Sequence, residues 1–121
     1  MPSPIQLYKD LIDGLVRIRR SVLCQWARGD GWPNTPDNTK INQLLSELSP
    51  TQREVLAEIV QRARDGGIHD TLVYLNDEAA IRGLRLVRDG VEVAVQPFDT
   101  EMYYDWTART EGDAWPDERK A

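Results

Sequence analysis

The sequence predicts an α+β fold that is mainly helical: about four helices packed with one β-hairpin over residues 84–96, then a short C-terminal helix. Through most of the chain before Gly83, apolar residues recur at three- and four-residue spacing, the pattern of amphipathic helices. Two alternating runs then flank Asp89-Gly90, a pair favoured by a two-residue hairpin turn. Because 121 residues is typical of one domain, residues 1–121 are expected to form a single domain around one core.

The first helix is predicted from Pro4 to about Arg28. Ser3 is a favourable N-cap residue, and proline is tolerated at the first helical position because its missing N–H needs no partner there. One apolar stripe continues through the segment, formed by Tyr8, Leu11, Ile12, Leu15, Ile18, Val22 and Trp26. The glycines and prolines of residues 29–38 then end the helix, and Trp32 is expected to fold back from this loop onto the core.

Two more helices are predicted in the middle of the chain. Residues 41–48 form a short one with apolar residues on one face. Ser49-Pro50 starts the next, with Gln52 at the position that completes a capping box. Gly66-Gly67 is expected to end this helix.

Residues 67–83 are ambiguous. The segment 71–75 has the β-branched and aromatic composition of a strand. The apolar positions Ile68, Leu72, Leu75 and Ala79 nevertheless keep helical spacing. A helix is predicted, and the choice between helix and strand for residues 71–75 stays open.

The hairpin is the clearest local signal. A two-residue turn at Asp89-Gly90 pairs Arg88 with Val91 and Val87 with Glu92. The apolar residues of the two runs then share one face, which is expected to be buried: Leu84, Leu86, Val93 and Val95. The residues expected to be exposed on the opposite face are Arg85 and Glu92. Because a lone hairpin is marginally stable, it must pack on helices or gain a third strand.

A short helix is predicted over about residues 101–109, with Thr100 as its cap. Met102 and Trp106 lie one turn apart and form the most apolar pair on it, so Trp106 is expected to face the core. The neighbours expected to stay partly exposed are Tyr104 and Asp105.

Charge is unevenly distributed along the chain. The net charge is −5, of which residues 1–66 contribute +1 and residues 67–121 contribute −6. An acidic surface repels phosphate backbones, so no nucleic-acid binding is expected, whereas a basic protein partner would be attracted. The last residues, 110–121, are acidic and rich in turn formers and are expected to form a mobile tail.

Several functional classes are disfavoured. The N-terminus lacks the features of a signal peptide and no apolar stretch is long enough to cross a bilayer, so a cytoplasmic protein without membrane contact is expected. One cysteine, Cys24, fits a reducing compartment. With one histidine and one cysteine, and no glycine-rich phosphate-binding motif, neither a metal nor a cofactor is expected.

Carboxylates and aromatic rings are densest in residues 99–106. The candidate binding residues are Asp99, Glu101, Tyr103, Tyr104, Asp105 and, as the single histidine, His69. The favoured function is a non-enzymatic interaction module that binds a basic protein, and homodimerisation through the hairpin is also considered. The alternative is a small enzyme or ligand-binding domain that uses His69 with Asp70 or Asp105. An enzyme is disfavoured, because neighbours in a helix point in different directions and a short helical chain offers little cleft.

The second half of the chain resembles a small family of bacterial proteins with no assigned function. The resemblance rests on "GGIHDTLVYLNDEAAIRGLRLVRDGVEV" followed by "PFDTEMYYDW". It implies a bacterial, cytoplasmic source and carries over no catalytic residues.

Overall fold

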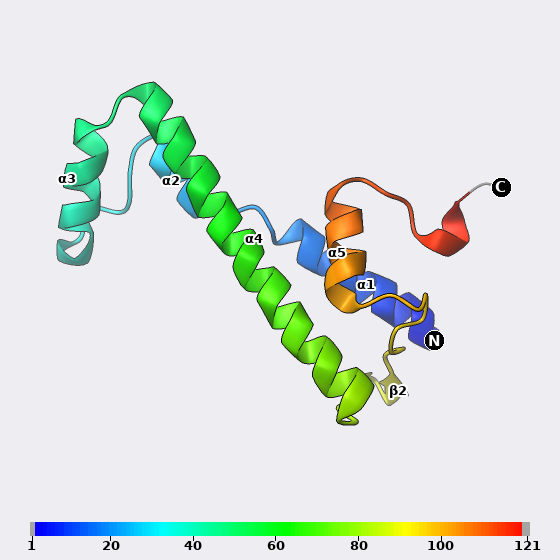
Figure 1. Cartoon of the computed structure of the whole chain (residues 1–121). Coiled ribbons are helices and arrows are strands. Elements are labelled where there is room, and N and C mark those ends of the chain that lie inside the picture. Colours follow the sequence, from blue (N-terminus) through cyan, green and yellow to red (C-terminus); the bar gives the residue numbers. More distant parts are fainter. Residues whose placement is uncertain (1, 120–121) are drawn as a thin grey trace. The chain divides into compact units, whose positions relative to one another are not determined.

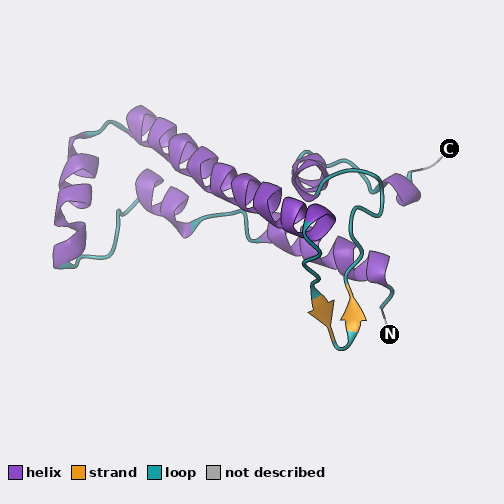
Figure 2. Cartoon of the chain, turned by 60° about the horizontal axis from the view of Figure 1, so that its bottom comes forward, coloured by secondary structure: helices purple, strands orange, loops and turns teal. Residues whose placement is uncertain are grey.

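The computed structural model describes residues 2–119, which adopt the predicted, mainly helical α+β fold (Figures 1 and 2). The elements follow in the order α1 (Pro4–Arg17), α2 (Val22–Arg28), the 3-10 turn η1 (Pro36–Asn38), α3 (Thr39–Glu47), α4 (Pro50–Ile81), β1 (Val87–Arg88), β2 (Val91–Glu92), α5 (Met102–Thr110) and the 3-10 turn η2 (Pro116–Glu118).

These residues divide into two compact units. The terminal unit combines the described residues up to Ile18 with those from Gly67 onward, and the central unit is Arg19–Gly66. Each unit has its own hydrophobic cluster. That residues 1–121 form a single domain stays a prediction, and each unit is described by itself.

The prediction of one helix over residues 4–28 is wrong, because α1 ends at Arg17 and α2 starts at Val22. Ser21 is extended and its Oγ accepts a hydrogen bond from the backbone N–H of Leu23 (3.1 Å). A serine can cap a new helix in this way in competition with helix continuation. The predicted N-cap of α1 is confirmed: Ser3 Oγ accepts from the N–H of Gln6 (3.1 Å).

Helix α4 also differs from its prediction. The capping box is present, since Ser49 Oγ accepts from the Gln52 N–H and Gln52 Oε1 accepts from the Ser49 N–H. The predicted end at Gly66-Gly67 is wrong, because the helix continues to Ile81 and includes residues 71–75. Glycine weakens a helix by about 1 kcal/mol relative to alanine, and good helical segments on both sides outweigh that cost here.

The core of the terminal unit gathers residues from both ends of the chain. Helices α1 and α5 pack directly against each other, and α4 contributes its last turns. The cluster of buried residues comprises Tyr8, Ile12, Leu72, Met102, Trp106 and Trp115.

The central unit has a smaller cluster, in which Cys24, Ala27 and Ala57 are buried. Trp32 packs against this cluster, as predicted, with its ring edge-on to Trp26 at 5.7 Å. Asn42 holds the Trp32 backbone: its Oδ1 accepts from the N–H (2.9 Å) and its Nδ2 donates to the carbonyl (3.0 Å).

The hairpin register is confirmed, with Val87 opposite Glu92 and Arg88 opposite Val91. Figure 2 shows the two short strands side by side, joined by a tight turn. Both turn residues have positive φ, 51° at Asp89 and 82° at Gly90, as a two-residue hairpin turn requires. Arg85 and Glu92 are exposed, as predicted.

The predicted burial of the apolar hairpin face is wrong in degree. Leu84 and Val95 are 40% and 38% exposed, and Leu86 and Val93 are half-buried. The four side chains do share one side, but each strand is only two residues long, so the hairpin is too short to form a full layer over the helices.

The described part of the expected tail packs against α1. Trp115 is buried, with its ring edge-on to Tyr8 at 5.9 Å and its Nε1–H donated to Asp13 Oδ1 (3.3 Å). Lys9, itself buried, pairs with Asp117 (2.8 Å) and Glu118 (3.0 Å). The mobility of this segment stays a prediction, but up to Arg119 it has defined contacts.

Although α4 has 32 residues, neither it nor any other helix among the described residues is apolar enough to cross a membrane.

Candidate functional site

Helix α5 positions most of the candidate residues. The N–H of Met102 donates to Asn76 Oδ1 on α4 (3.0 Å) in a buried hydrogen bond. Met102 and Trp106 both lie in the core, which confirms the predicted inward orientation of Trp106. The cap residue is Glu101, so the predicted cap at Thr100 is wrong.

Asp105 is buried, with 1% of its surface exposed, and the prediction that it is partly exposed is wrong. Its Oδ2 accepts a hydrogen bond from the Tyr8 hydroxyl (2.5 Å), and its Oδ1 accepts one from Thr100 Oγ1 (2.6 Å). Its position about 100° round the helix from Trp106 turns it toward α1 rather than toward solvent. The Thr100 side chain, predicted to cap α5, thus donates to the Asp105 carboxylate instead.

This buried network keeps Tyr8 protonated. Burial raises the pKa of the Tyr8 hydroxyl well above its ordinary value, and the hydrogen bond to the Asp105 carboxylate raises it further. The hydroxyl is therefore a permanent donor at neutral pH. Burying a carboxylate away from water is costly unless hydrogen-bond donors satisfy its oxygens. The Tyr8 and Thr100 hydroxyls are these donors for Asp105, so the network stabilises the fold.

His69 and Tyr103 come together from α4 and α5. Their ring centroids are 5.2 Å apart with the planes at 59°, and both residues are half-buried. His69 Nδ1 lies 3.4 Å from Asp70 Oδ1. The described structure thus joins His69 to Tyr103 and Asp70, while Asp105 belongs to the separate Tyr8 network.

The remaining candidates surround the start of α5. Tyr104 is 56% exposed, Asp99 is exposed and Glu101 is half-buried. Among the ion pairs of residues 2–119, none includes Asp99 or Glu101. We call these three residues the Tyr104 surface.

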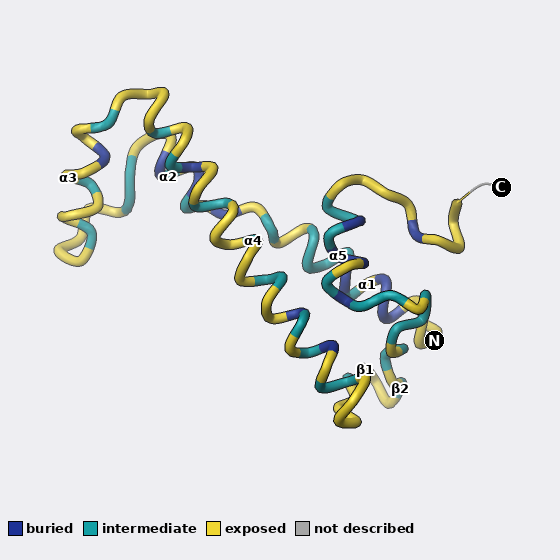
Figure 3. The backbone as a smooth tube through the Cα atoms, in the orientation of Figure 1, coloured by how far each residue is buried: buried dark blue, intermediate teal, exposed yellow. Residues whose placement is uncertain are grey.

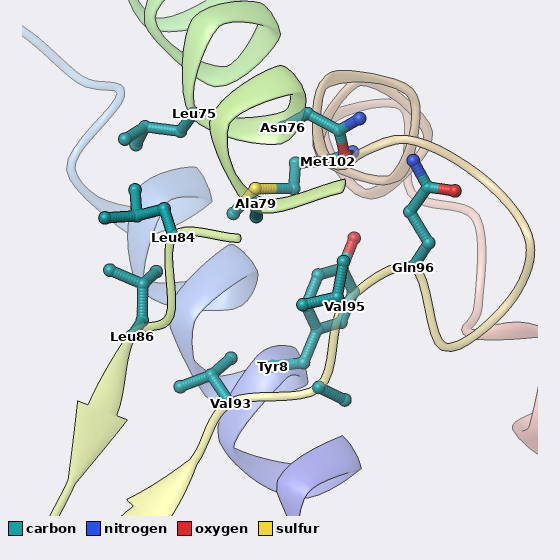
Figure 4. A pocket seen from close by; sticks show the side chains of 11 residues that line it. Tyr8, Leu75, Asn76, Ala79, Leu84, Leu86, Val93, Val95, Gln96 and Met102 are labelled. Atoms are coloured by element: carbon teal, nitrogen blue, oxygen red, sulfur yellow. Dashed lines mark hydrogen bonds between the residues drawn. The ribbon is translucent and has the colours of Figure 1, made fainter. Parts of the chain in front are cut away.

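An apolar crevice lies under the hairpin (Figure 4). The hairpin residues Leu84, Leu86 and Val93 form one wall, and Tyr8 and Met102 lie opposite. Its free volume is about 20 Å³, enough for roughly one water molecule. The crevice is therefore a packing gap and not a substrate pocket.

A second, wider hollow of about 420 Å³ holds residues that the sequence analysis missed. Arg109 lies over the Trp115 ring, 4.3 Å from its centroid, and Arg17 and Asp13 line the same hollow. Within residues 2–119, Arg109 Nε and Nη1 are buried without a hydrogen-bond partner. The sequence did contain one indication of this hollow: Trp115 is a large apolar residue, which is unusual in a mobile tail.

Among the described residues, no three histidine, cysteine, aspartate or glutamate side chains lie close enough together to hold a metal ion.

Comparison with curated proteins found no match, and comparison with solved structures found none. A family model does match. It is described as a family of unknown function, DUF6547, and covers residues 1–117, nearly the whole chain. The match includes α1 and the central unit as well as the second half of the chain. The chain belongs to the DUF6547 family of unknown function.

Proposed function

We propose that this chain is a non-enzymatic interaction module that binds a basic protein through the Tyr104 surface. The observation that carries the proposal is the exposed Tyr104 ring, close in sequence to two carboxylates, Asp99 and Glu101, that form no ion pair among the described residues. Tyrosine is enriched among the residues that dominate binding energy at protein interfaces. An arginine of the partner can stack on the ring while Asp99 and Glu101 attract its charge.

Because Asp105 is buried, it is not part of the proposed binding surface, but Tyr104 remains exposed. Asp105 and Trp106 point into the terminal unit and hold α5 in place. Tyr104 precedes them in the helix and points to solvent. Asp105 and Trp106 are thus structural, and we assign binding to Tyr104 with Asp99 and Glu101.

The alternative is a ligand-binding domain or small enzyme that uses His69 with Asp70 or Asp105. It has less support, because Asp105 is committed to Tyr8 and Thr100. The hollows described above are lined by neither His69 nor Asp105. The contact of His69 with Tyr103 is explained by packing of α4 on α5.

Site-specific photocrosslinking in the source cells tests the proposal. A benzophenone amino acid replaces Tyr104 in one variant and Tyr74 in the control, because Tyr74 is 62% exposed on α4. We expect a defined protein adduct from position 104 and no such adduct from position 74.

A second arm tests the charge. Replacing Asp99 with Asn and Glu101 with Gln should reduce the adduct at position 104 several-fold, and raised salt should do the same, because the attraction is screened. Equal adducts from both positions, or a yield indifferent to these charges, would contradict the proposal.

A further inference from the structure

The central unit leaves large apolar side chains in water. Along α3, Ile41 and Leu44 are 37% and 52% exposed, and on α4 Val55 and Ile59 are 52% and 57% exposed. Figure 3 shows exposed residues along α3 and along the first half of α4. Val55 and Ile59 are one turn apart, so they lie on the same face of the helix. Exposed apolar residues that share one helix face, as Val55 and Ile59 do, are typical of an interaction site.

The central unit has a small core of its own. The buried residues of its cluster are the small Cys24, Ala27 and Ala57, and the one large side chain buried within residues 19–66 is Leu45. Short units bury a small fraction of their apolar surface and commonly rely on association for stability. Covering Val55 and Ile59 would add to the apolar area that the central unit buries.

The charges beside this face are self-complementary. Glu58 lies just before Ile59, and Arg62 follows one turn later; both are exposed. If a second α4 crosses antiparallel near Ile59, Glu58 of each copy lies close to Arg62 of the other. A two-fold axis makes this contact twice. A parallel arrangement would instead bring like charges together, which is unfavourable.

We propose that the chain forms a homodimer in which α4 packs antiparallel against α4 of a second copy. Val55 and Ile59 form the seam, and Glu58 pairs with the partner's Arg62. This surface lies in the central unit, so it is independent of the Tyr104 surface in the terminal unit. It also differs from dimerisation through the hairpin, which would use the opposite end of α4.

Sedimentation velocity over a range of concentrations tests the dimer. The unchanged chain should sediment with twice the mass of one chain, and Ile59→Asp should shift it to the monomer. Glu58→Lys and Arg62→Glu should each weaken the dimer at least ten-fold. The double variant, Glu58→Lys with Arg62→Glu, should recover most of the affinity, because the pair is restored in reverse.

Val87→Asp is the matched control. Val87 is 60% exposed on the outer side of the hairpin, so its replacement should leave the dimer intact. Circular dichroism confirms that each variant is folded. A chain that stays monomeric into the millimolar range overturns the proposal. The proposal is also overturned if Val87→Asp dissociates the dimer and Ile59→Asp does not. It is likewise overturned if the double variant dimerises no more tightly than the two single variants.

Discussion

Neighbouring residues in the stretch 99–106 have different roles, which the amino-acid composition of the stretch does not reveal. Asp105 lies in the interior and accepts two hydroxyl hydrogen bonds, whereas Tyr104, its neighbour, is exposed. The hydroxyl that holds Asp105 comes from Tyr8, 97 residues away in the sequence. Local sequence patterns therefore could not predict that Asp105 is buried. The inward orientation of Trp106 could be predicted from its spacing to Met102.

Tyr8 predicts a loss of stability at alkaline pH. Its pKa is raised in the folded state, so its contribution is complete below the ordinary tyrosine pKa of about 10. Above that pH the unfolded chain loses this proton while the folded chain keeps it, and stability falls as pH rises. Melting temperatures between about pH 9 and 11 should drop less steeply in Tyr8→Phe than in the unchanged chain. Equal slopes would show that Tyr8 does not couple to unfolding.

At the scale of elements, local turn chemistry was predictable and helix continuity was not. The two-residue turn at Asp89-Gly90 by itself determines how the two strands of the hairpin pair, and the observed pairing agrees with the prediction. The Gly66-Gly67 pair has the features of a helix end, yet α4 runs through it. At the break between α1 and α2, the Leu23 N–H donates to Ser21 Oγ, a cap that competes with continuation of the apolar stripe.

Gly90→Val should destabilise the chain by about 1 kcal/mol or more, because Gly90 has a φ of 82° and valine resists positive φ. Asp89→Asn is the control: asparagine is favoured in this turn type, so it should leave the free energy of unfolding unchanged. Urea unfolding of both variants measures the difference. A stable Gly90→Val chain would contradict the turn geometry.

The glycines within α4 give the opposite expectation. A Cβ built on Gly66 or Gly67 meets no other atom within 4 Å. Gly66→Ala and Gly67→Ala should therefore each raise the free energy of unfolding by about 0.5–1 kcal/mol, because alanine favours the helix. Denaturant unfolding provides the measurement. A loss of stability in either variant would indicate that α4 is not a continuous helix at this point.

At the scale of the molecule, the two chain ends meet in the terminal unit. Trp115 packs with Tyr8, Phe98 and Arg109, and Lys9 pairs with Asp117. The ion pair with Asp117 raises the pKa of Lys9. The fold class, the apolar positions of α1 and the hairpin follow from the sequence. The division into two units does not, because it depends on which segments, distant in sequence, gather around each cluster.

Trp115→Ala tests whether the C-terminal segment belongs to this unit. Removing a buried tryptophan should cost about 3–5 kcal/mol of stability. The exposed Tyr74 again provides the control, since Tyr74→Ala should change the melting temperature little. If Trp115→Ala unfolds at the same temperature as the unchanged chain, the segment after Thr110 does not contribute to the fold.

Residues 99–106 hold a structural carboxylate, Asp105, and a proposed binding surface around Tyr104. The most direct test compares two variants for melting temperature and for partner crosslinking from a benzophenone at position 111, which is exposed and lies two turns after Tyr104. Asp105→Ala should lower the melting temperature strongly, because the hydroxyls of Tyr8 and Thr100 lose their acceptor. Tyr104→Ala should leave the melting temperature unchanged and abolish the crosslink. A stable Asp105→Ala chain, or a Tyr104→Ala chain that crosslinks as before, would contradict the account.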